Sequence, residues 1–284
     1  MRTDRSRKAL HLCSSLAIAT GLLAGASSAR AQSFQGTATV VAGSATVNTA
    51  PSTTTVNVSG NAVINWAPTD TATGGGPIDF QPVGTTATFT SFTDFAVLNR
   101  ILPTDPSRAV QFNGTVISQI QQTTTFPGGT VFFYSPGGVI LGPTAVFNVG
   151  NLGLTSASPV FNASTGEFDT GNVVTFSAAN PGTLVDIQPG AQINALQEGS
   201  YVAAFAPAIR QNGTVTVNGQ AAYVAGEAGT ITFSPDGLFD IQVSVGTDGV
   251  GGGPGPGNAI RHGGTTTGPA SSGAGDNHRI YMVA

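Results

Sequence analysis

Carboxylates are the residues of this sequence with the most capacity for chemistry, because the groups that usually act beside them are missing. Between Ser33 and Asn258 the chain contains no histidine, cysteine or lysine. Neither a Ser-His-Asp triad nor a Cys-His pair can therefore be assembled there. A pair of carboxylates, as used in glycoside hydrolysis, is the remaining route to catalysis. The candidate acids are Glu167, Asp169, Asp186, Glu198, Glu227, Asp236 and Asp240.

The surroundings of these acids argue against a catalytic pair. Glu167 and Asp169 would share one face of an extended strand, but residues 162–171 have the composition of a turn. Asp236 precedes Gly237, which is likewise a turn signal. We therefore predict no catalytic residue and no enzymatic activity.

Metal and cofactor binding are not expected either. His262 and His278 lie sixteen residues apart, in or beside a glycine-rich stretch that could not hold a zinc site rigidly. Asp248 alone offers too few oxygens for calcium, and the Gly-Gly-x-Gly-x-Asp repeat of calcium-binding coils is missing around it. We predict solvated histidines, no metal and no cofactor.

The first 31 residues have the features of a secretory signal peptide. A basic region of three arginines and Lys8 precedes an apolar stretch at residues 16–26, and Ala29-Arg30-Ala31 suits signal peptidase. We predict Sec-dependent export and cleavage between Ala31 and Gln32. A membrane anchor is disfavoured, because Thr20-Gly21 interrupts an apolar stretch that is already too short to span a bilayer.

Removal of the signal peptide leaves an acidic chain without lysine or cysteine. Five of the ten basic residues and one of the fourteen acidic residues precede Gln32, so five positive and thirteen negative charges remain, a formal net charge of −8. Disulfides are thereby excluded, although the exported compartment is oxidising. Five scattered arginines cannot form a basic face, so nucleic-acid binding is not expected.

Composition and patterning predict an all-β fold. Charged residues make up only 8% of the chain, whereas the recurring threonine and valine favour strands and the glycine and asparagine favour turns. Residues 131–134, 139–141 and 146–149 are strand-length apolar runs, and the Gly/Pro turns between them leave no room for a helix. This pattern predicts a coil of stacked strand-and-turn rungs. Further strands are expected at 78–82, 87–95, 97–102, 117–120, 173–176, 184–187, 191–193, 201–205, 215–217, 221–224 and 231–233.

The two ends of the coil differ in composition. Residues 33–65 alternate as strands, broken at Ala50-Pro51 and Ser59-Gly60, and are expected to cap the first rung, with Trp66 as the anchor. Residues 246–284 are rich in glycine and proline and are expected to form a disordered tail. Its strand-like last segment is either the start of a longer or truncated passenger or a short edge strand folding back.

Two Asn-Gly pairs leave their role open. Asn113-Gly114 and Asn212-Gly213 are typical of two-residue hairpins, but in a coil they serve equally well as corners.

Four segments, in order, resemble the N-terminal secretion domain of filamentous haemagglutinin, which belongs to two-partner secretion systems. Residues 98–101, Leu-Asn-Arg-Ile, are similar to its Asn-Arg-Val/Ile element, and residues 117–120 to the rung that follows. Residues 128–154 are similar to its strand–turn–strand signature, and residues 199–226 to its closing pattern. In the signature, Ser135 to Gly138 stand where Asn-Pro-Asn-Gly is usual. The likeness covers about residues 33–245.

The resemblance implies a right-handed parallel β-helix over residues 32–245, with an N-terminal β cap. It also implies export through an outer-membrane barrel transporter of the two-partner type, by way of the periplasm, to the cell surface or the extracellular space. The secretion-motif candidates are Asn99, Arg100, Ser135, Pro136, Gly137 and Gly138. From the residues alone, Asn99 is expected to cap a turn, and Arg100 to pair with Asp94 or Asp105.

Two functions from different classes remain open. The first is a non-enzymatic secretion domain of a large adhesin, which contacts a host or neighbouring cell surface. The alternative is a freestanding extracellular structural or carbohydrate-binding β-helix protein. A self-transporting protein with its own C-terminal barrel is a variant of the first.

Overall fold

A computed structural model describes residues 32–169, 172–234, 238–247, 259–269 and 278–284. The predicted signal peptide, together with Asp236 and Asp248, lies outside these residues. Every regular element in the described ranges is a β-strand, which confirms the all-β prediction. Within those ranges, no helix has the length and apolar character needed to cross a membrane.

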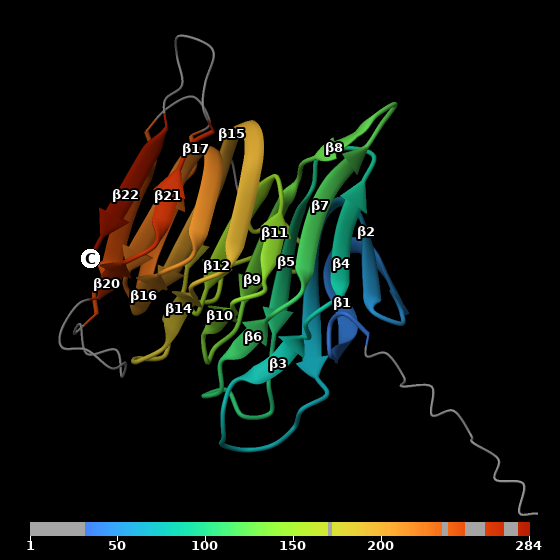
Figure 1. Ribbon diagram of the computed structural model, residues 1–284, viewed down its shortest axis with the longest axis horizontal. Helices are drawn as coiled ribbons and strands as arrows, with labels where there is room; N and C mark the ends of the chain where they lie inside the picture. Colours follow the sequence, from blue (N-terminus) through green and yellow to red (C-terminus); the bar gives the residue numbers. More distant parts are fainter. Residues whose placement is uncertain (1–31, 170–171, 235–237, 248–258, 270–277) are drawn as a thin grey trace, which may run out of the picture.

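Most strands stack in parallel, and successive passes of the chain add strands to three columns (Figure 1). The first column is a separate six-stranded sheet. In stacking order it contains β3 (Ile78–Gln81), β6 (Val110–Phe112), β10 (Val139–Leu141), β14 (Leu184–Ile187), β16 (Ala208–Gln211) and β20 (Ile260–His262).

The second and third columns belong to one larger sheet, in which the long strands β15 (Gln192–Ala206) and β17 (Thr214–Ala225) run through both columns. The second column is completed by β4 (Thr86–Ser91), β7 (Thr115–Gln121), β11 (Val146–Asn148) and β21 (Thr265–Thr267). The third is completed by β5 (Ala96–Ile101), β9 (Thr130–Tyr134), β12 (Asn151–Thr155) and β22 (Arg279–Val283). The result is a β-helix-like parallel fold, as the rung pattern predicted.

Both Asn-Gly pairs form corners of the coil. Asn113-Gly114 joins β6 to β7 and Asn212-Gly213 joins β16 to β17, in each case leading from the six-stranded sheet into the larger one. The corners stack so closely that a Cβ on Gly114 would lie 2.6 Å from the carbonyl oxygen of Thr85. Glycine is therefore needed there for close approach and not for a hairpin.

An antiparallel hairpin of β1 (Gly36–Ala50) and β2 (Thr53–Pro68) lies at the N-terminal end of the stack, where a cap was expected. Residues 53–57 of β2 pair with β4, and residues 61–66 pair with β5. The predicted break at Ser59-Gly60 is wrong, because β2 is continuous through it. Gly60 adopts a φ of 73° with open space around its Cα, so the strand bends between the two columns without ending.

The inside of the coil is an apolar core with a strong aromatic component. Phe34 precedes β1 and is fully buried, 5.0 Å between ring centroids from Phe80 and 5.1 Å from Trp66. Phe112 continues the cluster, with its ring centroid 4.9 Å from that of Phe133. Trp66 is fully buried on the strand that pairs with β5, which confirms its predicted role as the anchor of the cap.

A second apolar cluster lies on the outer face of the third column. A small antiparallel sheet of β13 (Val173–Phe176), β18 (Ala228–Thr232) and β19 (Asp240–Val245) covers this face. The strands expected at 173–176 and 231–233 are present, but they do not belong to the coil. The third column carries apolar residues on both faces, and these strands cover its outer face. Phe132 and Phe205 point to the outer cluster, while Phe133 points inward.

The prediction of a disordered C-terminal tail is wrong for the described residues. Parallel pairing joins β20 to β16, and β21 and β22 to β17, so the chain adds one more strand to each column. The glycines of this region permit the pairing. A Cβ on Gly264 would lie 2.2 Å from the carbonyl oxygen of Gly213, at a corner that stacks on the one below.

Candidate functional site

Asn99 is a fully buried bridge between the cap and the coil, and not the exposed turn cap that was expected. Its Oδ1 accepts a hydrogen bond from Trp66 Nε1 at 3.0 Å, and its Nδ2 donates to the carbonyl oxygen of Phe132 at 3.2 Å. The side chain thereby ties β2, β5 and β9 together. Because Asn99 is fully buried, we predict that it stabilises the fold and affects a binding partner only indirectly.

Arg100 lies next to Asn99 on the opposite face of β5 and is only partly buried. The predicted ion pair with Asp94 or Asp105 is wrong. The guanidinium carbon lies 5.3 Å from the ring centroid of Phe161 and 5.9 Å from that of Tyr134, and Nη1 donates to Asn65 Oδ1 at 3.3 Å. Aromatic faces attract a planar cation in this geometry, so Arg100 is held flat on the outer surface.

Asp105 instead receives other donors. Its carboxylate accepts hydrogen bonds from the backbone N–H of Gly74 and from Ser107, which lower the pKa of Asp105. Arg108 is the cation of this region and pairs with Asp70 at 2.8 Å. The Asp70–Arg108 ion pair and the hydrogen bond from Gly74 to Asp105 hold the loop after β2 against the turn before β6.

Ser135, Pro136, Gly137 and Gly138 form a tight turn between β9 and β10. The backbone N–H of Gly138 donates to the carbonyl oxygen of Ser135 at 3.0 Å, and Ser135 is fully buried with its Oγ unpaired among the described residues. Gly138 has a φ of 106°, a conformation that favours glycine. A Cβ on Gly137 would lie 2.2 Å from the carbonyl oxygen of Arg108, and one on Gly138 would lie 2.5 Å from that of Leu184.

The turn is therefore sandwiched between the rung before it and the rung after it. Asn99 and Arg100 lie in the third column, whereas this turn lies at a corner between columns. Arg100 nevertheless pairs with Tyr134, the residue immediately before the turn, so the two groups of secretion-motif candidates are neighbours in the fold. Their role in secretion stays a prediction.

The candidate catalytic acids are spread over different elements. Asp186 is on β14, where Gln188 Nε2 donates to it at 3.3 Å, while Glu198 is on β15 and Glu227 follows β17. Asp240 is exposed on β19 and accepts a hydrogen bond from Gln242. Glu167 and Asp169 lie in the loop between β12 and β13, as the composition of that segment predicted. No two of these acids share a hydrogen bond among the described residues.

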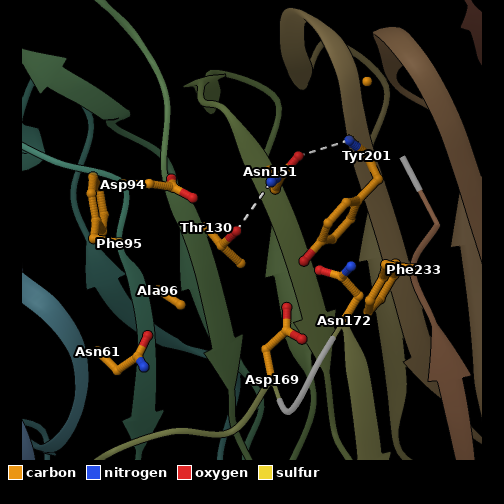
Figure 2. Close-up of a pocket in the computed structure, with 11 residues that line it drawn as sticks. Asn61, Asp94, Phe95, Ala96, Thr130, Asn151, Asp169, Asn172, Tyr201 and Phe233 are labelled. Atoms are coloured by element: carbon orange, nitrogen blue, oxygen red, sulfur yellow. Dashed lines mark hydrogen bonds between the residues drawn. The ribbon is translucent and has the colours of Figure 1, made fainter. Parts of the chain in front are cut away.

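Asp169 nevertheless contributes to a cavity of about 350 Å³ on the outer side of the third column (Figure 2). The walls come from the starts of successive strands and from the segments that cover them. The lining residues are Asn61, Asp94, Phe95, Ala96, Thr130, Asn151, Asp169, Asn172, Gly199, Tyr201 and Phe233. No basic residue is among them.

The register of the strands explains why these residues meet. Asn61 pairs with Ala96, Ala96 with Thr130, and Thr130 with Asn151, so one position of each rung forms a straight column of side chains. Asn151 Nδ2 donates to Thr130 Oγ1 at 3.1 Å, and Asn151 Oδ1 accepts from the backbone N–H of Tyr201 at 3.0 Å. These bonds fix the back wall of the cavity.

Two acids and a phenol point into this space (Figure 2). Burial raises the pKa of Asp169, and the charges of Glu167 and Asp94 act in the same direction against a hydrogen bond from the backbone of Asn172. Asp169 Oδ1 is buried and unpaired among the described residues. Burial also raises the pKa of Tyr201 well above its usual range, with the charge of Asp169 adding to the effect.

Sequence reasoning did not find this cavity. Asp94, Asn151 and Tyr201 lie far apart in the chain, and each stands in an ordinary strand or turn. The signal that could have found it is the register itself, because the alignment of β9 with β12 places Thr130 beside Asn151, although no strand was predicted at residues 151–155.

The two histidines are partly exposed, and each also has a protein partner. His262 Nε2 lies 2.8 Å from Thr266 Oγ1 within the last rung, and His278 Nε2 lies 3.1 Å from Asn218 Oδ1 of β17, which helps to attach that rung to the one before it. In the part of the chain that the structure describes, no group of three or more His, Cys, Asp or Glu residues could hold a metal ion.

Comparison with known proteins places this architecture among β-helix-like parallel folds. No protein-family model matches the chain, and no curated protein matches it. Among solved structures, the fold is similar to that of the HMW1 secretion domain from Haemophilus influenzae, with a TM-score of 0.50 and 18% sequence identity. The similarity covers 74% of this chain and 49% of that one, so this chain spans about half the length of the solved domain.

Proposed function

We propose that this chain is an exported secretion domain of the two-partner type, folded as a right-handed parallel β-helix and without catalytic activity. The observation that carries the proposal is the stack of parallel rungs closed at its N-terminal end by the β1–β2 hairpin. That stack is similar in fold to the HMW1 secretion domain, and its order of motifs resembles the filamentous haemagglutinin family.

The route of export follows from the same features. The Sec machinery delivers the chain to the periplasm, and an outer-membrane barrel transporter then passes it to the cell surface. A chain without cysteine after residue 13 forms no disulfide that would lock it before passage. Because each rung contacts mainly its neighbours, rungs that emerge first can template those that follow.

The absence of catalysis is part of the proposal. Apart from Glu167 and Asp169, which share one loop, the candidate acids lie on different elements of the fold. Asp169 is accompanied in its cavity by Asp94, with Tyr201 and asparagines around them. Such a set is better suited to binding than to acid–base chemistry.

Of the secretion-motif candidates, Arg100 and Pro136 are the two that are partly exposed. Asn99 is fully buried, as is Ser135. Arg100 is held on the outer surface by two aromatic rings. We propose that Asn99 and the Ser135–Gly138 turn act by shaping the fold, while Arg100 contributes directly to recognition.

The test is co-expression of the chain with the barrel transporter encoded nearest to its gene, followed by measurement of the chain in the medium and its protease accessibility at the surface. We expect export to require the barrel. Arg100→Gln should reduce export several-fold at unchanged thermal stability. Arg210→Gln, which changes an arginine of similar partial burial on β16, should not.

Export that is independent of any barrel would contradict the secretion-domain proposal. A second proposal, a freestanding extracellular binding protein, is favoured by the polar cavity around Asp94, Asp169 and Tyr201. The reading frame after Ala284 distinguishes the secretion-domain proposal from the freestanding-protein proposal. A continuing frame of repeats beside a barrel gene would support a large adhesin that contacts a cell surface, whereas a stop codon with no barrel nearby would support the alternative.

A further inference from the structure

The cavity on the third column is acidic and has an unused hydrogen-bonding group. Tyr201 is 6% exposed, and Figure 2 shows its hydroxyl pointing into the same space as the carboxylate of Asp169. The Thr130 hydroxyl lies nearby and lowers the pKa of Tyr201 against the effect of burial, but the two hydroxyls do not meet the geometry of a hydrogen bond. Tyr201 Oη has no hydrogen bond of good geometry to any described residue. A buried phenol in this state has lost water without gaining a partner, which a bound ligand would correct.

The acidic lining of the cavity determines which charge that ligand carries. Asp94 and Asp169 line it, Glu167 lies close enough to affect Asp169, and no lysine, arginine or histidine lines the wall. An adjoining cavity of about 290 Å³ shares Asp94, Asn151 and Gly199 with the first and adds Glu198. An anion would be repelled from this set, and a neutral sugar would leave the carboxylate charge uncompensated.

The size and the donor set of the cavity point to an organic cation and not to a metal ion. A volume of about 350 Å³ holds a group as large as an amino-acid side chain. No cluster of three or more His, Cys, Asp or Glu residues in the described ranges could hold a metal ion. Carboxylates and amide oxygens accept charge-assisted hydrogen bonds from ammonium and guanidinium groups, and the aromatic walls of Phe95 and Tyr201 favour a planar cation.

We propose that this cavity binds an organic cation, an ammonium or guanidinium group of side-chain size, between Asp94 and Asp169, with Tyr201 as the third polar contact. The group can come from a free amine or from a lysine or arginine side chain of a polypeptide. The site lies on the outer face of the stack, away from the Ser135–Gly138 turn, and the proposal does not depend on the export function.

Calorimetric titration of the purified exported chain tests this site with two probes. Agmatine represents a free organic cation, and a blocked Gly-Arg-Gly peptide represents an arginine side chain. The same peptide with citrulline in place of arginine is the neutral control. We expect at least one cationic probe to bind and the citrulline peptide to bind at least about tenfold more weakly, because hydrogen bonds to charged groups are the stronger ones.

Variants locate the binding. Asp94→Asn and Asp169→Asn should each weaken binding at least about tenfold, and Tyr201→Phe should weaken it several-fold, while the exposed Asp240→Asn should leave it unchanged. Circular dichroism checks that each variant is folded. If Asp169→Asn does not fold, Asp94→Asn alone tests the carboxylate contacts. Tighter binding of the peptide indicates a polypeptide source, and tighter binding of agmatine a free amine.

Three results would overturn the proposal. The first is binding of neither cation, and the second is equal binding of the citrulline peptide. The third is binding of calcium or of methyl glucoside in place of the cations, with the same dependence on Asp94 and Asp169.

Discussion

At the scale of single residues, Asn99 connects more of the molecule than its size suggests. It is the acceptor for the only indole of the chain and also a donor to β9. A buried donor that loses its partner costs about 1–3 kcal/mol. Asn99 is therefore better described as a buried hydrogen-bonding link between the cap and the coil than as an exposed recognition residue.

We expect Asn99→Leu to lower the free energy of unfolding by about 1–3 kcal/mol, because the Trp66 N–H would stay buried and unpaired. Urea denaturation measures this loss. In a Trp66→Phe background, which has no indole N–H, Asn99→Leu should cost clearly less. Equal costs in the two backgrounds would show that the Trp66–Asn99 bond is not the reason.

Substitutions at three glycines distinguish the cost of a strained φ angle from the cost of close packing. Gly84 has a φ of 75° with nothing near its missing Cβ, Gly137 has a close contact without a positive φ, and Gly138 has both. We expect Gly84→Ala to cost about 1 kcal/mol from the φ angle alone. Gly137→Ala should cost about 1–3 kcal/mol from overpacking, and Gly138→Ala should cost the most. Thermal and urea unfolding check the order, and a Gly138→Ala variant as stable as Gly84→Ala would contradict it.

The raised pKa of Asp169 has a defined effect on stability. Burial raises that pKa in the folded state, so the folded state holds the proton more tightly than the unfolded chain does. Ionised Asp169 therefore destabilises the fold above its folded pKa, and this penalty disappears as the pH falls below the unfolded value. We expect Asp169→Asn to raise the Tm at pH 7 and to leave it unchanged near pH 3. A Tm gain that is the same at both pH values would refute the assignment to ionisation.

At the scale of elements, the third column has two buried faces and serves two cores. Val131 and Phe133 face the inside of the coil. Phe132 faces the outer cluster, where its ring centroid lies 5.2 Å from that of Phe168 in the β12–β13 loop and 6.4 Å from that of Phe233, which directly follows β18. The strand thus carries a continuous apolar run instead of an alternating one, as buried parallel strands do.

Substitutions on the two faces of β9 should therefore have different consequences. Val131→Asp or Phe133→Asp places a charge in the inner core and should prevent folding. Phe132→Ala should cost about 3–5 kcal/mol and loosen mainly β13, β18 and β19. Hydrogen exchange should then rise in those strands while β3, β6 and β10 stay protected. A uniform rise over the whole domain would argue against a separately docked outer sheet.

Strand positions in the coil were predictable from the sequence because the apolar runs are short and the turn residues between them are distinctive. Residues 139–141 and 184–187 match β10 and β14 closely. The membership of 173–176 and 231–233 in an outer sheet was not predictable, because a strand pattern does not state which surface it covers. The strands β20 and β21 of the last rung were missed because glycine signals flexibility in sequence, whereas Gly264 serves close corner stacking.

The candidate site was less predictable than the fold. The motif residues Asn99 and Arg100 were found from the sequence, but their partners were not, since Trp66 and Phe161 come from distant parts of the chain. The acidic cavity depends on register over four strands. No local pattern around Asp94 or Tyr201 encodes that alignment.

At the scale of the whole molecule, stability is distributed along the stack. Each rung pairs with the rungs before and after it, so its loss should be felt by its neighbours first. A chain ending at residue 247 lacks β20, β21 and β22 and exposes the edges of β16 and β17. We expect it to fold with lower stability and to self-associate more, because unpaired edges invite pairing.

Hydrogen exchange and light scattering measure these effects. Protection should fall at β16 and β17 and stay unchanged at β3 and β6, with the chain that extends to residue 284 as the control. Loss of protection throughout would mean that the stack folds as one indivisible unit.

The direction of the hydrogen bonds between rungs also determines how the domain responds to tension. They run along the axis of the stack, and no disulfide fastens one rung to the next in a chain without cysteine after residue 13. Pulling on the two ends loads these bonds one row at a time instead of shearing many together. Under tension the domain should lengthen in small steps, one rung per step, and so behave as an extensible spacer between its two ends.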